Sequence, residues 1–242
     1  MNYKIILDEQ ILRYFIEWLP ELTPDETYYV SLFARNKYQN KDASNPISHI
    51  KSDKQQLKRF TTSRNRLFDK LKQCECEVGS YKQYKLTKEP VEVPQECLVP
   101  YITVNPRSFK KATKNGLIKF ATLLANENGS IGYNPHAEVM SEIQKSWSRK
   151  PYFNVDIDID DKENFDFDFL KGYININCIS VLETRGGYHL LIKLDEIEEQ
   201  YKRSWYQNII SKNKSFIDQT GDGMIPIPGC HQGGFMPNFV VI

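Results

Sequence analysis

Three aspartates alternate with aliphatic residues in the stretch YFNVDIDIDD, residues 152–161. Because Asp156, Asp158 and Asp160 are two positions apart, a β-strand would place their carboxylates on one face. Like charges on one strand face repel, and aspartate is disfavoured in strands. A divalent cation would make such a row tolerable, since Mg²⁺ and Mn²⁺ prefer hard oxygen ligands. The pattern therefore predicts a metal site on a strand; a surface strand of solvated acids, or a calcium-binding loop, is the alternative.

A second candidate group follows in the runs ISVLETR and YHLLIKL, which are joined by Gly186-Gly187 and so predict a β-hairpin. His189 leaves this turn on a strand. If the sheet register allows, its side chain points to the same side of the sheet as the aspartates, where a groove would lie; otherwise it is an ordinary strand residue. The Gly/Pro-rich stretch FIDQTGDGMIPIPGCHQ then supplies two more aspartates. We expect Asp218 on a strand beside the acidic one, and Asp222, between two glycines, in a solvent-facing turn.

The elements that must position these residues can be predicted from hydrophobic periodicity and from capping residues. Strands are expected at residues 26–35 and 101–105, and residues 73–100 read as a proline-containing, loop-rich strip. Helices are expected at residues 8–19, 51–72, 108–129 and 195–210, and in a segment that begins with Asn134 and Pro135. Strand, hairpin, helix and loop in that order predict an α+β fold, an antiparallel sheet with helices packed on one side.

The predicted helix at residues 51–72 carries eight basic and two acidic residues. Such a helix is either a solvated charged surface or a contact for a nucleic-acid backbone. The segment NPRSFKK offers a second basic cluster. The candidate nucleic-acid contacts are Lys58, Arg59, Arg64, Arg66, Arg107, Lys110 and Lys111.

Global composition narrows the class of protein. The chain has 242 residues, of which 40% are hydrophobic, and its formal net charge is +1, so electrostatic binding must come from local patches. No apolar run is long enough to span a bilayer, and the N-terminus lacks the pattern of a signal peptide. Five cysteines, an odd number, suggest reduced thiols, so we expect a cytoplasmic protein without membrane contact. A zinc site at Cys74, Cys76 and Cys97 is an alternative that lacks the usual spacing.

Three motifs, in this order, resemble those of the archaeo-eukaryotic primase superfamily, which includes the primase-polymerases. The first is the strand NVDID, the second is the small-residue turn and strand GGYHLLI, and the third is the aspartate ahead of a Pro-Gly loop in FIDQTGDGMIPIPGCHQ. Together they span residues 152–235, about a third of the chain. Each motif is short, and their order and spacing are more specific than any one of them.

The resemblance implies a primase-polymerase-like core of two α/β modules, the C-terminal one similar to an RNA-recognition fold. We expect an N-terminal module over residues 1–100, with the basic helix as template contact, and a catalytic module with the metal site over residues 101–242.

The resemblance also implies roles for individual residues. Asp156, Asp158 and Asp218 would bind Mg²⁺ or Mn²⁺, and His189 would contact the phosphates of the incoming nucleotide. The sequence departs from the family at Gly187, where a serine is common, and in the apolar MIPIPG, where a basic residue is frequent. Substitute phosphate contacts are Arg185, Lys193 and His231.

The predicted function is therefore template-dependent nucleotidyl transfer, as in a DNA primase or DNA polymerase, with single-stranded DNA as template and nucleoside triphosphates as substrates. A nucleic-acid-binding module without catalysis and a DxD sugar-nucleotide transferase are the alternatives. The chain has no helicase P-loop, so unwinding would come from a separate helicase or replisome protein, in a prokaryotic, phage or plasmid replication context.

Overall fold

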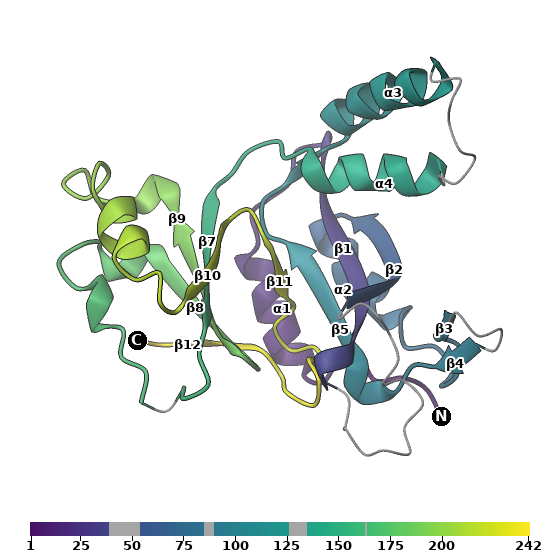
Figure 1. Cartoon of the computed structure of the whole chain (residues 1–242), viewed down its shortest axis with the longest axis horizontal. Coiled ribbons are helices and arrows are strands. Elements are labelled where there is room, and N and C mark those ends of the chain that lie inside the picture. Colours follow the sequence, from purple (N-terminus) through teal and green to yellow (C-terminus); the bar gives the residue numbers. More distant parts are fainter. Residues whose placement is uncertain (39–53, 85–89, 126–134, 163) are drawn as a thin grey trace.

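Two antiparallel sheets, packed side by side, form the frame of the molecule (Figure 1). The computed structural model describes residues 1–38, 54–84, 90–125, 135–162 and 164–242. In this part of the chain the fold is mixed α+β with few helices, as the sequence predicted at that level. The helices are α1 (Glu9–Trp18), α2 (Leu67–Lys72), α3 (Phe109–Ala125) and α4 (Pro135–Lys145). None of the helices in the described ranges is long and apolar enough to cross a membrane.

The first sheet has the strand order β11-β5-β1-β2, and β6 also pairs with the start of β1. One face of β1 carries the core residues Tyr28, Val30 and Leu32, which pack against α1 and α2. On the opposite face, α3 and α4 cover the start of β1 through Tyr29. The strands are β1 (Glu26–Arg35), β2 (Lys54–Thr62), β5 (Leu98–Thr103), β6 (Arg107–Ser108) and β11 (Met224–Pro226), and a separate hairpin is formed by β3 (Lys82–Tyr84) and β4 (Pro90–Glu92).

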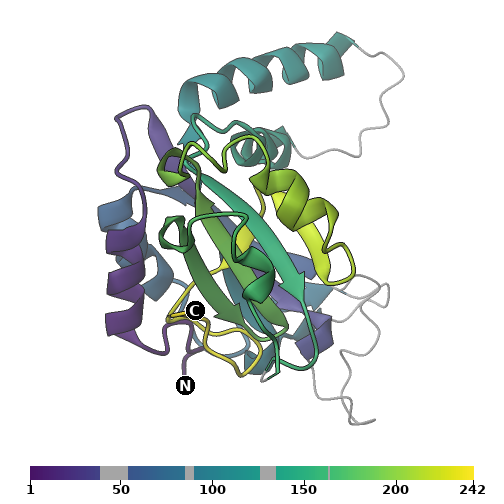
Figure 2. The same ribbon diagram turned by 90° about the vertical axis from the view of Figure 1, so that its left-hand side faces the viewer.

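The second sheet has the strand order β10-β7-β9-β8-β12. Its outer face packs on a core that includes Val155, Ile157, Trp205 and Ile209, under a helical turn and connecting loops (Figure 2). Its inner face is turned toward the first sheet, where the ring of Tyr152 packs at a tilt against Trp18 of α1. The strands are β7 (Tyr152–Asp158), β8 (Ile179–Thr184), β9 (Gly187–Lys193), β10 (Ile217–Gly221) and β12 (Asn238–Val240).

The division between the sheets does not fall at residue 100. β5 spans that position and pairs with β1, and β11 returns from the C-terminal half to complete the first sheet. Residues of the loop-rich strip, such as Cys74, Val93 and Cys97, are buried in the first core. The elements from α1 to α4 therefore belong with the first sheet, which also takes β11 from the C-terminal half, and the first strand of the second sheet is β7.

Two predicted helices are wrong. In the described part of residues 51–72, Lys54–Thr62 is strand β2, and only Leu67–Lys72 is α-helical. Here the alternation of exposed and half-buried residues along β2 overrides the weaker helical spacing, because antiparallel pairing with β1 runs along the whole of β2, with one bulge. Residues 195–210 contain turns and then a short π-helical segment, Gln207–Ser211. The expected caps at Asn134 and Asn128-Gly129 lie outside the described residues.

The other predicted elements are confirmed. Helix α1 begins after Asp8, whose carboxylate accepts hydrogen bonds from the backbone N–H groups of Gln10 and Ile11, at 2.8 and 3.0 Å. The hairpin of β8 and β9 turns over Arg185-Gly186, with Thr184 paired to Gly187. The acidic strand is β7, which ends at Asp158, so Asp160 lies beyond the strand.

Candidate active site between the two sheets

A polar pocket opens where the inner face of the second sheet meets the first sheet. Its cavity volume is about 130 Å³. Its charged and titratable lining comes from both sides. The second sheet contributes Asp156, Asp158, Asp218 and His189, and the first contributes Arg35, Lys37 and Lys54.

The three carboxylates come from the neighbouring strands β7 and β10. Gln219 pairs with Asp156 and Ile217 pairs with Ile157, so Asp218 is the extra residue of a bulge. A bulge redirects side chains, and here both Asp218 and Gln219 line the pocket. The expected strand position of Asp218, beside the acidic strand, is thus observed.

The surroundings of Asp156 oppose the ionisation of its carboxyl group. Its side chain is 30% exposed. Burial, together with the negative charges of Asp218 and Asp158, raises the pKa of Asp156 to about 6, while Lys37 and Lys54 act in the opposite direction. Desolvation and like charges both oppose ionisation of a carboxyl group. The site therefore gathers negative charge at an energetic cost that a bound cation would remove.

His189 lies directly opposite Asp156 in the pairing of β9 with β7. Its Nδ1 is 3.1 Å from Oδ1 of Asn154 and 3.7 Å from Oδ1 of Asp156. Burial lowers the pKa of His189 to about 4, so the ring is neutral at pH 7. In the tautomer with its proton on Nδ1, the ring donates to Asn154. A phosphate in the pocket would favour the protonated ring, because a nearby negative charge stabilises the cation.

Gly187, where the family commonly has serine, is fixed by backbone geometry. Its φ is +146°, and a Cβ atom there would lie 2.0 Å from the carbonyl oxygen of Ile157. Only glycine fits such a close approach at a positive φ. The departure therefore allows the β8–β9 hairpin to pack tightly on the acidic strand.

The basic side of the pocket was not predicted from the sequence. Arg35, at the end of β1, donates a hydrogen bond to the hydroxyl of Tyr101 at 2.7 Å, and its guanidinium lies 5.6 Å from the ring centre of Tyr38. Lys37 follows β1, and Lys54 is paired with Arg35 at the start of β2. Strand alternation places Arg35 on the face opposite the core, yet nothing local indicates that this face meets the carboxylates.

A buried polar cluster ties the two sheets together beside the pocket. Asn105 exchanges two 2.9 Å hydrogen bonds with the backbone of Tyr152 at the start of β7, and it donates to Asp222 at 2.8 Å. Asp222 lies between β10 and β11 and forms a 2.6 Å ion pair with Arg107, whose side chain is 1% exposed. Two expectations are corrected here. Asp222 is no solvent-facing turn residue, and Arg107 is too deeply buried to contact nucleic acid.

The three substitute phosphate contacts lie outside the pocket lining. Lys193 is at the far end of β9 and pairs with Glu196. His231 is buried; its Nδ1 lies 2.9 Å from the carbonyl oxygen of Leu98, and its Nε2 accepts from the N–H of Gly234 at 3.2 Å. Arg185 borders the site, where its guanidinium stacks 4.7 Å from the Tyr38 ring centre and donates to the carbonyl of Gly233. Of the three, Arg185 is the one near the pocket.

The candidate nucleic-acid contacts are scattered over several surfaces. Arg64 donates to the carbonyls of Ile16 and Glu17 at the end of α1, each at 2.7 Å, so it closes that helix. Arg59 on β2 reaches Ser141 of α4. Lys58 is exposed on β2, Arg66 precedes α2, and Lys110 and Lys111 are exposed on α3.

Asp156, Asp158 and Asp218 are the residues that could hold a divalent cation. In the described ranges, no group of three or more His, Cys, Asp or Glu side chains is arranged to hold a metal ion without further ligands from outside the protein. An open arrangement suits Mg²⁺, which keeps several waters and commonly uses one or two carboxylates together with substrate phosphates.

The zinc alternative fits poorly: burial raises the pKa of the Cys97 thiol to about 12 and also raises that of Cys74, whereas zinc needs thiolates.

Comparison with known proteins gives no relative on which to base an assignment: no family model, no curated protein and no solved structure matches this chain.

Proposed function

We propose that the chain is a template-dependent nucleotidyltransferase similar to the primase-polymerases of the archaeo-eukaryotic primase superfamily. One observation carries the proposal. Three carboxylates and a histidine from one sheet line the same pocket as three basic side chains from β1, the turn that follows it, and β2. A nucleoside triphosphate needs both charge types, because its phosphates require cations and its bound metals require oxygen ligands.

The residues of the chain would act mainly by position and charge. Asp156, Asp158 and Asp218 would hold Mg²⁺ or Mn²⁺ at the edge formed by β7 and β10. When bound, a pair of such ions activates the attacking hydroxyl and stabilises the pyrophosphate that leaves. Lys37 and Lys54 would neutralise the phosphates from the opposite side.

His189 would bind a phosphate as it becomes protonated. Its contact with Asn154 holds the ring plane, so Nε2 is the nitrogen left to meet a ligand. Because the neutral ring is favoured in the free protein, we expect nucleotide binding to be accompanied by proton uptake at this residue.

The decisive test is incorporation of a labelled nucleotide on a primed single-stranded DNA template, with and without Mg²⁺ or Mn²⁺. We expect incorporation by the wild-type chain, and losses on the order of 100- to 1,000-fold in Asp158→Asn and Asp218→Asn. Asp160→Asn is the matched control, since Asp160 follows the same sequence pattern but lies beyond β7, and it should retain activity.

Each alternative gives a different result in the same assay. DNA binding without incorporation, in both metals, would indicate a non-catalytic nucleic-acid-binding protein. Transfer from a sugar nucleotide without use of DNA would indicate a glycosyltransferase. Equal incorporation by the wild type, Asp158→Asn and Asp218→Asn would remove the carboxylates from the mechanism.

A further inference from the structure

Trp147 is an exposed aromatic side chain between two lysines. Its side chain lies on the surface, at 42% exposure, whereas Trp205 is buried in the second core and Trp18 packs against Tyr152. The Nζ atoms of Lys150 and Lys111 lie 4.2 and 4.8 Å from the ring centre of Trp147. The ring and the two ammonium groups together present an aromatic surface and positive charge to solvent at one place.

The backbone that presents Trp147 is held firmly. Its neighbours are hydrogen-bonded to the region of β6: the N–H of Ser108 donates to the carbonyl of Ser146 at 2.7 Å, and the N–H of Ser148 donates to that of Pro106 at 2.8 Å. Trp147 itself is bridged to Arg107, which the ion pair with Asp222 fixes in turn. The ring is therefore presented by an ordered segment, which lowers the entropic cost of binding.

The surroundings of Trp147 are basic although the whole chain is nearly neutral. The two segments that meet here, 107–114 and 145–150, contain no aspartate or glutamate. Arg107 is buried and Arg149 is paired with Glu26. The remaining basic residues of these two segments are exposed: Lys110, Lys111, Lys114, Lys145 and Lys150.

We propose that Trp147 is a base-stacking site for single-stranded nucleic acid, with Lys111 and Lys150 binding the flanking phosphates. An indole ring stacks on any base, and ammonium groups beside it neutralise the backbone without regard to sequence. The choice of nucleic acid over an acidic peptide rests on the proposed function. In the bound state the two ammonium groups move from the ring to the phosphates and a base takes their place.

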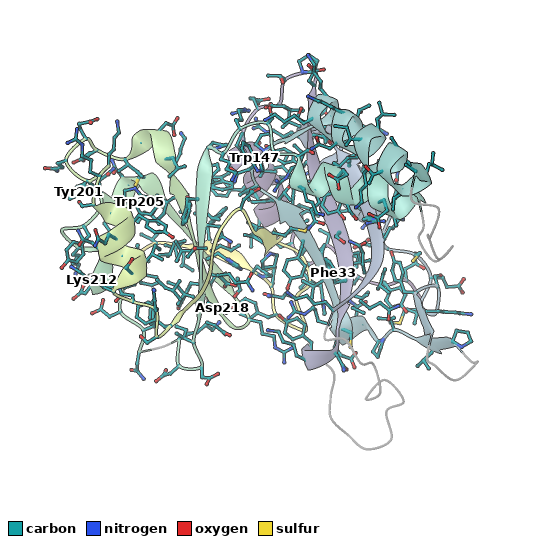
Figure 3. The ribbon with its side chains drawn as sticks, turned by 45° about the horizontal axis from the view of Figure 1, so that its top comes forward. Phe33, Trp147, Tyr201, Trp205, Lys212 and Asp218 are labelled. Carbon is teal, nitrogen blue, oxygen red and sulfur yellow. The ribbon has the colours of Figure 1, made fainter. Side chains whose placement is uncertain are left out.

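The position of this site suits a template strand that continues past the pocket. Trp147 lies just before β7, and the carboxylates lie at the other end of that strand, roughly 20 Å along it. Figure 3 shows Trp147 beside the base of the α3–α4 pair and Asp218 farther along, between the two sheets. The stacking site would thus hold the strand several nucleotides away from the reacting end.

Binding of an oligothymidylate, without metal, tests the site directly. Trp147 is the most exposed tryptophan, so stacking of a base should quench the intrinsic fluorescence, and Trp147→Phe should remove most of the quenching while keeping most of the affinity. Trp147→Ala should weaken binding, measured by anisotropy of a labelled oligonucleotide, about tenfold, the order expected for one stacked base. Tyr14→Ala, at an exposed aromatic on α1, is the matched control and should bind normally.

The lysines and the choice of ligand are tested in the same titrations. Lys111→Gln with Lys150→Gln should flatten the salt dependence of log K by about 1.4, two phosphate contacts on a single strand, and Lys202→Gln should leave it unchanged. Normal affinity of Trp147→Ala, absence of quenching in the wild type, or equal binding of inorganic polyphosphate to the same patch would overturn the proposal. Tight binding with quenching but no nucleotide incorporation would support the stacking site and contradict only the proposed catalysis.

Discussion

The two sides of the pocket are built differently. On the first sheet, Arg35 is bonded to the hydroxyl of Tyr101 and stacked near Tyr38, so its charge has partners in the fold. On the second sheet, Asp156 is partly buried next to two further carboxylates, and its pKa is raised to about 6. The Arg35 guanidinium thus has partners within its own side of the pocket, whereas ionisation of Asp156 is opposed by burial and by the neighbouring carboxylates.

This difference indicates where a ligand would act. Strain at a polar site persists only where the surrounding structure enforces it, and a group whose ionisation is opposed gains most from a bound cation. Binding at the acidic side would therefore stabilise the protein. The contrast between the two sheets depends on their relative placement. That placement is held by the cluster around Asp222 and by the second-sheet residues Tyr152, Leu182 and Leu191, which pack in the first core.

The largest effect is expected on the free energy of unfolding, when the polar cluster between the two sheets is disrupted. Asp222→Ala leaves the Arg107 guanidinium buried without its partner carboxylate, which should lower the free energy of unfolding by about 3–5 kcal/mol. The measurement is chemical denaturation followed by circular dichroism. Asp168→Ala breaks the exposed ion pair with Lys171 and is the control, with no measurable change expected. If Asp222→Ala were as stable as the control, the two sheets would be held together by their apolar contacts alone.

A smaller effect on the free energy of unfolding, of opposite sign, is expected when Asp156 is replaced. Because the folded-state pKa of about 6 lies above the ordinary value of 3.8, the folded state binds the proton more tightly than the unfolded state. The penalty for ionisation therefore grows as the pH rises from about 4 to 6 and is complete at pH 7. Asp156→Asn, which cannot ionise, should be more stable than wild type by up to about 3 kcal/mol at pH 7.5 and should gain nothing at pH 4.

Thermal melting at several pH values, in EDTA, measures this dependence. Asp160→Asn should show no such pH-dependent gain, because Asp160 is exposed and lies beyond β7. A stability gain of Asp156→Asn that persists unchanged at pH 4 would show that ionisation is not its cause. Addition of Mg²⁺ should raise the melting temperature of the wild type more than that of Asp156→Asn.

The smallest effect is expected when a lysine on the basic side of the pocket is replaced, and it concerns binding of the nucleotide. Lys37→Gln or Lys54→Gln should raise the KM for the incoming nucleotide about tenfold, the order expected for one lost charge-assisted contact, and should leave affinity for the template unchanged. Lys193→Gln is the matched control, because Lys193 lies on the same strand as His189 but at the opposite end, paired with Glu196. An equal rise of KM in the control and in the two variants would mean that overall charge, and not this pocket, governs binding.

Local features explain which predictions from the sequence succeeded. Alternation in NVDID predicted strand β7 and the common face of Asp156 and Asp158, since strand geometry fixes both. The glycines at 186 and 187 predicted the hairpin that carries His189, and the apolar residues before Asp218 predicted its strand. Each of these features is contained within about ten residues, so the sequence alone determined them.

Non-local contacts decided the rest. The segment 54–62 has apolar residues at helical spacing, but pairing with β1 made it a strand. β1 is separated from this segment along the chain by residues outside the described part, so the segment by itself does not reveal the pairing. Asp222 was predicted in a solvent-facing turn because its neighbours are glycines. Its carboxylate instead pairs with the buried Arg107, 115 positions away. Arg35, Lys37 and Lys54 meet the carboxylates because β11 returns to the first sheet and Asn105 anchors β7 against it. Such contacts depend on how whole sheets pack, and no short stretch of sequence encodes them.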